Sequence, residues 1–264
     1  MAEQSTTEHP TAAAGAAPPT GAHAPAPAGA SAQGGGGAGQ PDQMPHATGP
    51  TALPPEHPLH GLRRSPAAHL AGEMAAGGRA GVAELREIPG APQWGLRAVP
   101  GSEAAARLEA ALGLALPAAR ASTGDAEALH LLWLSPDEFL AVDVSRPQSF
   151  GEAEALAEVL EPREASEDGP ARERAAGQVV DLSGNRTILE LTGAEARTVL
   201  EKGCHLDLHP RAFGVGDVAS TLLGPVPVIL HRSAGDTWRI YPRASFAEFT
   251  VRWLLDAMRE LTVA

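Results

Sequence analysis

Segments in which apolar and polar residues alternate run through the chain from residue 82 onward, and turn-forming residues separate them. A period of two predicts short strands with one buried face. The predicted strands lie within 82–88, 93–99, 129–135, 138–144, 178–182, 186–191, 218–223, 226–231 and 237–241. We expect the pairs within 82–99 and 178–191 to form hairpins. Pro225 and Pro227 are expected to place the strand 226–231 at a sheet edge or a bulge.

Apolar residues three or four positions apart predict helices after the strands, and one short helix at 63–76 before them. The expected N-caps are Ser65, Ser102, Ser149 and Thr192. Gly203 is expected to end its helix in the left-handed conformation. The helix 63–76 looks detached and is expected to act as an arm that docks on a partner. The closing helix, 245–261, carries Phe246 and Phe249 on its expected apolar face.

The element order predicts an α+β protein with two lobes of similar plan. The first sixty residues contain no Lys, Arg or aromatic residue, and Ala, Gly and Pro dominate them. Such a composition buries too little apolar surface to offset the entropy of ordering, so 1–62 is predicted to be a disordered tail. The domain is then 63–264, with lobes at about 80–160 and 178–264 and a charged linker at 161–177.

The formal net charge of −12 argues against a nucleic-acid-binding protein, which needs a basic surface. The single cysteine, Cys204, allows neither an intramolecular disulfide nor a zinc site built from several cysteines of this chain. No apolar run is long enough to cross a bilayer, and no signal peptide is evident, so we expect no membrane association and a cytoplasmic location.

One loop holds the densest group of potential metal ligands, namely Cys204, His205, Asp207 and His209. These residue types suit zinc or iron, although His residues four apart share a face only on a helix. The alternative is a structural loop that Leu206 and Leu208 anchor, while Asp207 and His209 bond backbone groups. In that case Cys204 is a buried structural thiol rather than a nucleophile.

Two further groups of polar residues have competing interpretations. Asp181 ends a strand, where it suits either a general base or an Asx-type turn. Arg232, Arg239 and Arg243, near Tyr241, suit either carboxylate binding or the protection of a sheet edge. No dinucleotide fingerprint or persuasive catalytic set accompanies them, so we assign no catalytic, cofactor-binding or metal-binding residue.

Several ordered motifs together resemble the γ subunit family of heterotetrameric sarcosine oxidase over about residues 63–261. They are Arg64-Ser65-Pro66-x-x-His69, Leu132 to Glu138, Asp181-Leu182-Ser183, Gly193-Ala194-x-Ala196-Arg197, Lys202 to Pro210, and Arg243 to Trp253. The chain departs from the family's usual residues at His205, where the family has Pro, and at Phe139, where it has Trp. That family is similar to the folate-binding T-protein of glycine cleavage, which implies paired ferredoxin-like lobes.

The resemblance implies a non-catalytic subunit of a complex that oxidises sarcosine to glycine, with hydrogen peroxide and 5,10-methylenetetrahydrofolate as further products. It places FAD, FMN, NAD, tetrahydrofolate and zinc on the other subunits, α, β and δ, with α as the main contact. The expected interface residues are His209, Arg211, Phe213, Arg239, Tyr241 and Arg243. The alternative is a stand-alone folate-binding one-carbon transfer protein, with Asp181 or Asp207 as its acid–base group.

Overall fold

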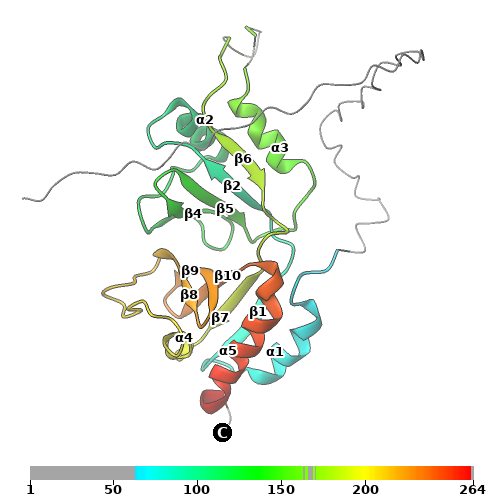
Figure 1. The fold of residues 1–264 in the computed structure, drawn as a ribbon, viewed down its shortest axis with the longest axis vertical. Coiled ribbons are helices and arrows are strands. Elements are labelled where there is room, and N and C mark those ends of the chain that lie inside the picture. Colours follow the sequence, from blue (N-terminus) through cyan, green and yellow to red (C-terminus); the bar gives the residue numbers. More distant parts are fainter. Residues whose placement is uncertain (1–62, 163, 166–168, 170, 263–264) are drawn as a thin grey trace, which may run out of the picture. The chain divides into compact units, whose positions relative to one another are not determined.

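The computed structural model describes residues 63–262 apart from 163, 166–168 and 170 (Figure 1). The predicted tail and part of the predicted linker lie outside the described residues. Two five-stranded antiparallel sheets confirm the α+β class. Sheet I has the order β3 (Ser122–Gly124), β4 (Leu129–Ser135), β5 (Glu138–Asp143), β2 (Gln93–Arg97), β6 (Gln178–Asp181). Sheet II has the order β1 (Glu84–Ile88), β7 (Ile188–Thr192), β10 (Thr237–Pro242), β9 (Val226–Ala234), β8 (Val218–Leu223).

Both hairpins expected from consecutive strands are wrong. β1 and β2 follow one another in the chain, yet β1 pairs with β7 in sheet II and β2 pairs with β5 and β6 in sheet I. The connection from β6 to β7 crosses between the sheets in the same way. The turn residues between these strands suit a crossing as well as a hairpin. Each sheet therefore contains one strand from the opposite half of the chain.

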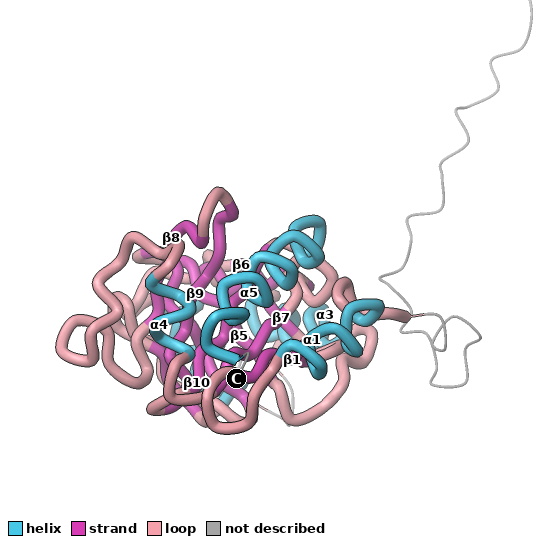
Figure 2. Tube along the Cα trace, turned by 90° about the horizontal axis from the view of Figure 1, so that it is seen from below, coloured by secondary structure: helices cyan, strands magenta, loops and turns pink. Residues whose placement is uncertain are grey.

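The helices cover the outer faces of the two sheets (Figures 1 and 2). Those with sheet I are α2 (Glu103–Leu112), α3 (Glu152–Ala157) and the 3₁₀ turn η3 (Glu158–Leu160). Those with sheet II are η2 (Ala68–Leu70), α1 (Ala71–Gly77), α4 (Ala196–Glu201), η4 (Ala244–Phe246) and α5 (Ala247–Thr262). A third apolar cluster, formed by Ile88, Leu132, Leu140, Val142, Ile188, Ile229 and Tyr241 among others, joins the sheets face to face. The layers are thus helices, sheet I, sheet II, helices.

Only one of the expected N-caps is confirmed. Ser102 Oγ accepts a hydrogen bond of 3.2 Å from the Ala105 amide at the start of α2. The N-caps expected at Ser65, Ser149 and Thr192 are wrong. The Ser65 hydroxyl donates to Glu87 instead, and Thr192 is the last residue of β7. The Ser65 hydroxyl therefore has another partner, and Thr192 belongs to a strand rather than to the start of a helix.

Gly203 does not take the expected left-handed conformation. A glycine is needed at this position for a different reason. A Cβ atom there would lie 2.4 Å from Cζ2 of Trp253. That distance is shorter than any van der Waals contact. Gly203 is therefore a point of close approach between the end of α4 and the α5 indole.

Of the two expectations for the strand 226–231, the edge position is wrong, because β9 lies between β10 and β8. A register irregularity between β10 and β9 does occur, but it lies at Thr237 and Trp238, opposite Ala234 and Arg232 and away from the two prolines. Pro227 is tolerated in β9 because it lies one residue beyond Val228, the last β9 residue paired with β10. The helix expected to be a detached arm packs on its own lobe. Leu70 and Met74 are 1% and 3% exposed in the core beneath sheet II, and α1 lies beside α5 (Figure 2).

Candidate interaction surface and buried polar row

A row of charged side chains crosses the inner face of sheet II, and its two central members, Glu190 and Arg239, are buried. Arg239 on β10 is 0% exposed, and its Nε donates to Oε2 of Glu190 on β7 at 2.9 Å. Glu190 also accepts a 2.8 Å hydrogen bond from Nε of Arg86 on β1. The remaining Arg239 nitrogens donate to the Ala126 carbonyl and, at 2.8 Å, to Glu127 of the turn before β4. One guanidinium therefore links sheet II to sheet I.

Two histidines from opposite sheets lie next to this row. The rings of His130 on β4 and His231 on β9 have centroids 5.4 Å apart, and each residue is 1% exposed. His130 Nδ1 donates to the Ala128 carbonyl at 2.9 Å, and Nε2 lies 3.5 Å from the Tyr241 hydroxyl. Neither ring nitrogen of His231 has a hydrogen-bond partner among the described residues.

Burial shifts the pKa values of these groups strongly. Burial lowers the pKa of His130 to about 4, and burial followed by the neighbouring His130 lowers the pKa of His231 to about 3. Burial also raises the pKa of the Tyr241 hydroxyl well above its usual range. Such shifts are typical of active sites. Here, however, the three side chains are sealed between the sheets, so all three are neutral at pH 7 and out of reach of a substrate.

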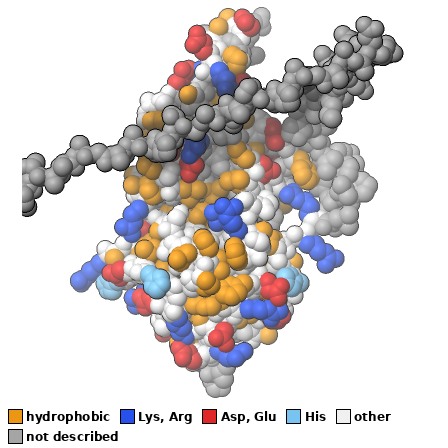
Figure 3. All heavy atoms as spheres, viewed as in Figure 1, with side chains coloured by type: hydrophobic (Ala, Val, Ile, Leu, Met, Phe, Trp, Pro, Cys, Tyr) orange, Lys and Arg blue, Asp and Glu red, His pale blue; other side chains and the backbone are white. Residues whose placement is uncertain are grey.

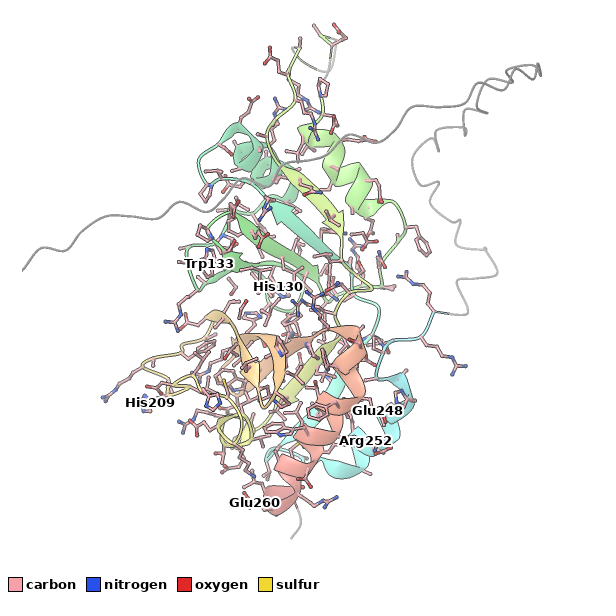
Figure 4. All side chains as sticks on the ribbon, in the orientation of Figure 1. His130, Trp133, His209, Glu248, Arg252 and Glu260 are labelled. Carbon is pink, nitrogen blue, oxygen red and sulfur yellow. The ribbon has the colours of Figure 1, made fainter. Side chains whose placement is uncertain are left out.

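The loop after α4 matches the structural alternative of the two given for it. Asp207 Oδ1 accepts a 2.9 Å hydrogen bond from the His209 amide, and His209 Nδ1 accepts one of 3.2 Å from the Arg211 amide. Leu208 is 1% exposed and anchors the loop, and Cys204 is buried. Figure 4 shows His209 on an outer loop, far from His130. Within the described ranges, no three His, Cys, Asp or Glu side chains gather as a metal site.

Asp181 forms the Asx-type turn rather than a free carboxylate. Its Oδ1 accepts a 2.8 Å hydrogen bond from the Ser183 amide, and its Oδ2 accepts one of 2.6 Å from Nε2 of Gln148. Both oxygens are therefore engaged within the chain.

Three of the six expected interface residues are buried inside this chain, so their side chains do not offer a surface to a partner. Phe213 is 0% exposed, and its ring centroid lies 5.4 Å from that of Trp238. Arg239 and Tyr241 alternate with Trp238 along β10, and the face that they share is covered by sheet I. His209, Arg211 and Arg243 are exposed and stay predictions.

The inner face of sheet II is left open at one end, where a groove of about 470 Å³ runs over β8 and β9. It is lined by Arg186, His205, Ser220, Thr221, Leu222, Pro227, Val228 and Ile229. Figure 3 shows hydrophobic side chains gathered on the same face of the molecule, over β8, β9 and α5. Sequence reasoning missed this groove, because only the packing of the two sheets decides which end is covered.

The described helices include none with both the length and the apolar character that crossing a membrane requires.

Among the described residues, the groups whose pKa values are shifted most are buried between the sheets. The class of this protein is therefore defined by its fold rather than by a reactive site. The structure is similar to the glycine cleavage system aminomethyltransferase T of Bartonella henselae, with a TM-score of 0.52 and 17% identity over 75% of this chain and 58% of that one. At this identity the likeness shows the fold alone, and it confirms the expected paired-lobe architecture.

Sequence comparison is more specific. The family model described as "Sarcosine oxidase, gamma subunit family" matches residues 97–260. Sarcosine oxidase subunit gamma of Arthrobacter sp. is 49% identical over 202 residues, which cover 75% of this chain and 91% of the relative. The subunit of Corynebacterium sp. strain P-1 is 50% identical over 200 residues, with the same coverage. A chain of the heterotetrameric sarcosine oxidase of Corynebacterium sp. U-96, in complex with pyrrole 2-carboxylate, matches with a TM-score of 0.67 and 46% identity over 77% of this chain and 98% of that one. The chain belongs to the sarcosine oxidase γ subunit family.

Proposed function

We propose that this chain is the non-catalytic γ subunit of a heterotetrameric sarcosine oxidase. The observation that carries the proposal is the match at 46% identity to 98% of a chain from such a complex. The complex would demethylate sarcosine oxidatively to glycine, with hydrogen peroxide and 5,10-methylenetetrahydrofolate as products. FAD, FMN, NAD, tetrahydrofolate and zinc would be bound by the α, β and δ subunits, the main contact would be with α, and the complex would work in the cytoplasm.

The state of the titratable groups supports a structural role. His130, His231 and Tyr241, whose pKa values are strongly shifted, are buried between the sheets rather than placed in an open cleft. Asp181 and Asp207 hold backbone turns. These two carboxylates were the expected acid–base groups of the stand-alone folate-binding alternative, and the comparisons favour the subunit over that alternative.

The test is co-expression of the tagged full-length chain with the α, β and δ chains encoded with it, followed by affinity purification. We expect stoichiometric recovery of all four chains, a flavin absorbance spectrum, and peroxide formation that depends on sarcosine. The matched control omits only this chain and carries the tag on the α subunit instead, and we expect the remaining subunits to be recovered in lower yield or as incomplete assemblies. Recovery of this chain by itself, yellow and active as an oxidase, would refute the proposal.

A further inference from the structure

Two arginines at the open end of sheet II lack a carboxylate partner among the described residues. Arg186 and Arg243 face one another across an isolated antiparallel bridge. Arg186 Nη1 donates to the Tyr241 carbonyl at 2.9 Å, and Arg243 is exposed. Burial, followed by the nearby charge of Arg243, lowers the pKa of Arg186. Two like charges held together in this way favour binding of an anionic group between them.

An aromatic stripe begins next to the arginines and runs along α5. Phe246, whose amide donates to the Arg243 carbonyl, is 40% exposed, and Phe249 is 47% exposed. Trp253 continues the stripe one turn further, because positions 246, 249 and 253 lie on one side of a helix. These side chains differ from the buried α5 residues, which face sheet II.

The stripe and the groove are continuous. The Trp253 indole lies within van der Waals distance of a Cβ placed on Gly224, in the turn between β8 and β9. Leu222, two residues before that turn, is 44% exposed and lines the groove, as does Arg186. An exposed apolar surface with a cationic end therefore surrounds the hairpin tip, and Figure 3 shows hydrophobic side chains gathered over these elements with basic side chains beside them.

We infer that this surface, formed by the β8–β9 groove and the α5 stripe, docks an apolar segment of another subunit of the oxidase that carries an Asp or Glu side chain. The inference rests on the proposed function. Large exposed apolar patches on a folded domain mark contact sites. Aromatic side chains are enriched at such contacts, and the carboxylate would pair with Arg186 and Arg243 in the bidentate geometry that guanidinium groups favour. Charge complementarity thus selects a carboxylate-bearing segment as the occupant.

The test uses the four-subunit complex assembled around the full-length chain, with dissociation on dilution followed by mass photometry. The variants are Phe249→Glu and Arg243→Glu. Matched controls are Val99→Glu, which charges an apolar side chain 62% exposed in the sheet I lobe, and Arg79→Glu in the loop before β1, at the opposite end of sheet II. All chains are first compared by thermal unfolding, and Phe249→Ser replaces any Phe249→Glu chain that does not fold.

We expect Phe249→Glu and Arg243→Glu each to raise about tenfold or more the midpoint concentration, at which half of the complex has lost this chain, as truncation of a contact hot spot does. Each control should change that concentration less than about twofold. If the wild-type chain recovers no other subunit, the proposed function itself fails. If the wild type assembles normally but Phe249→Glu and Arg243→Glu both behave like the controls, only this inference is overturned. Equal weakening by Val99→Glu or Arg79→Glu would also overturn it, because the effect would not be specific to the proposed surface.

Two alternatives to a segment of another subunit on this surface would give different results in the same experiment. A second copy of this chain would give particles of two γ chains that Phe249→Glu abolishes. The chain's own first 62 residues would give tighter subunit binding when they are deleted. Either result would overturn the inference, which requires the deletion to leave the midpoint unchanged within about twofold.

Discussion

Sheet I covers one part of the inner face of sheet II and leaves another part open. Arginine side chains in the two parts have different partners. In the covered part Arg239 is 0% exposed and bonds two carboxylates and a carbonyl. In the open part Arg186 and Arg243 meet no carboxylate among the described residues. Burial removes hydration, so a buried charge persists only when protein groups replace the lost water. The difference shows which part of the face is complete within this chain.

The largest effect on stability is expected from removing Arg239, the buried arginine of the covered part. We predict that Arg239→Ala lowers the free energy of unfolding by about 3–5 kcal/mol, because Glu190, itself 4% exposed, keeps a buried charge with only Arg86 beside it. Urea unfolding followed by tryptophan fluorescence measures the change.

Arg243→Ala is the matched control from the open part. It should change the free energy of unfolding by less than about 0.5 kcal/mol, since the side chain is exposed. The double variant Arg239→Met, Glu190→Leu removes both buried charges and should be more stable than Arg239→Met alone. If Arg239→Ala lowers the free energy of unfolding by less than about 1 kcal/mol, the Arg239–Glu190 ion pair does not stabilise the interface between the sheets as predicted.

The second prediction concerns pH. The pKa values of His130 and His231, about 4 and about 3 in the folded chain, lie below the unfolded value near 6.5. The unfolded state therefore binds protons more tightly, so stability is full above about pH 6.5 and falls as the pH drops toward 4. The loss amounts to about 2 kcal/mol for each histidine at about pH 5.

His231→Leu sharpens this test, because neither ring nitrogen of His231 has a partner among the described residues. The variant should keep its stability at pH 7 within about 1 kcal/mol and roughly halve the loss between pH 7 and 5. The matched control is His209→Ala, which removes an exposed histidine outside the sheet interface. The test is the free energy of unfolding, measured between pH 7 and 5. If its slope against pH is the same in His231→Leu as in the wild type, the prediction is contradicted.

The contrast between covered and open parts also shows where sequence reasoning stops. The period-two patterns predicted most strands and the α+β class correctly, because alternation depends on residues that are close in the chain. Arg239 and Arg243 lie four residues apart, and both received the same two interpretations from the sequence, carboxylate binding or protection of a sheet edge. Which of them is buried depends on sheet I, whose turn at Ala126 and Glu127 is more than 100 residues away in sequence. Local patterns carry no information about that contact.

A second error has the same cause. The apolar face expected on the closing helix included Phe246 and Phe249, yet the buried face is rotated toward Thr250 and Val251. The helix has a broad apolar surface, and only its packing on sheet II selects which part is buried. At His209 the structural-loop alternative matches the structure through short-range hydrogen bonds, which the sequence allowed but did not require.

The smallest effect is expected where the core meets the open surface, at Gly203. We predict that Gly203→Ala costs about 1–3 kcal/mol, since its new Cβ would lie 2.4 Å from Trp253 Cζ2 and the indole must move. The matched control is Gly184→Ala in the turn after β6, which has open space around it and no left-handed backbone, so it should be neutral or stabilising by up to about 1 kcal/mol. Because Trp253 also extends the α5 stripe, Gly203→Ala should weaken subunit docking as well as stability, whereas Gly184→Ala should affect neither. Thermal unfolding and dilution of the assembled complex measure the two effects separately, and a stable Gly203→Ala chain with normal docking would show that the indole position matters neither to stability nor to docking.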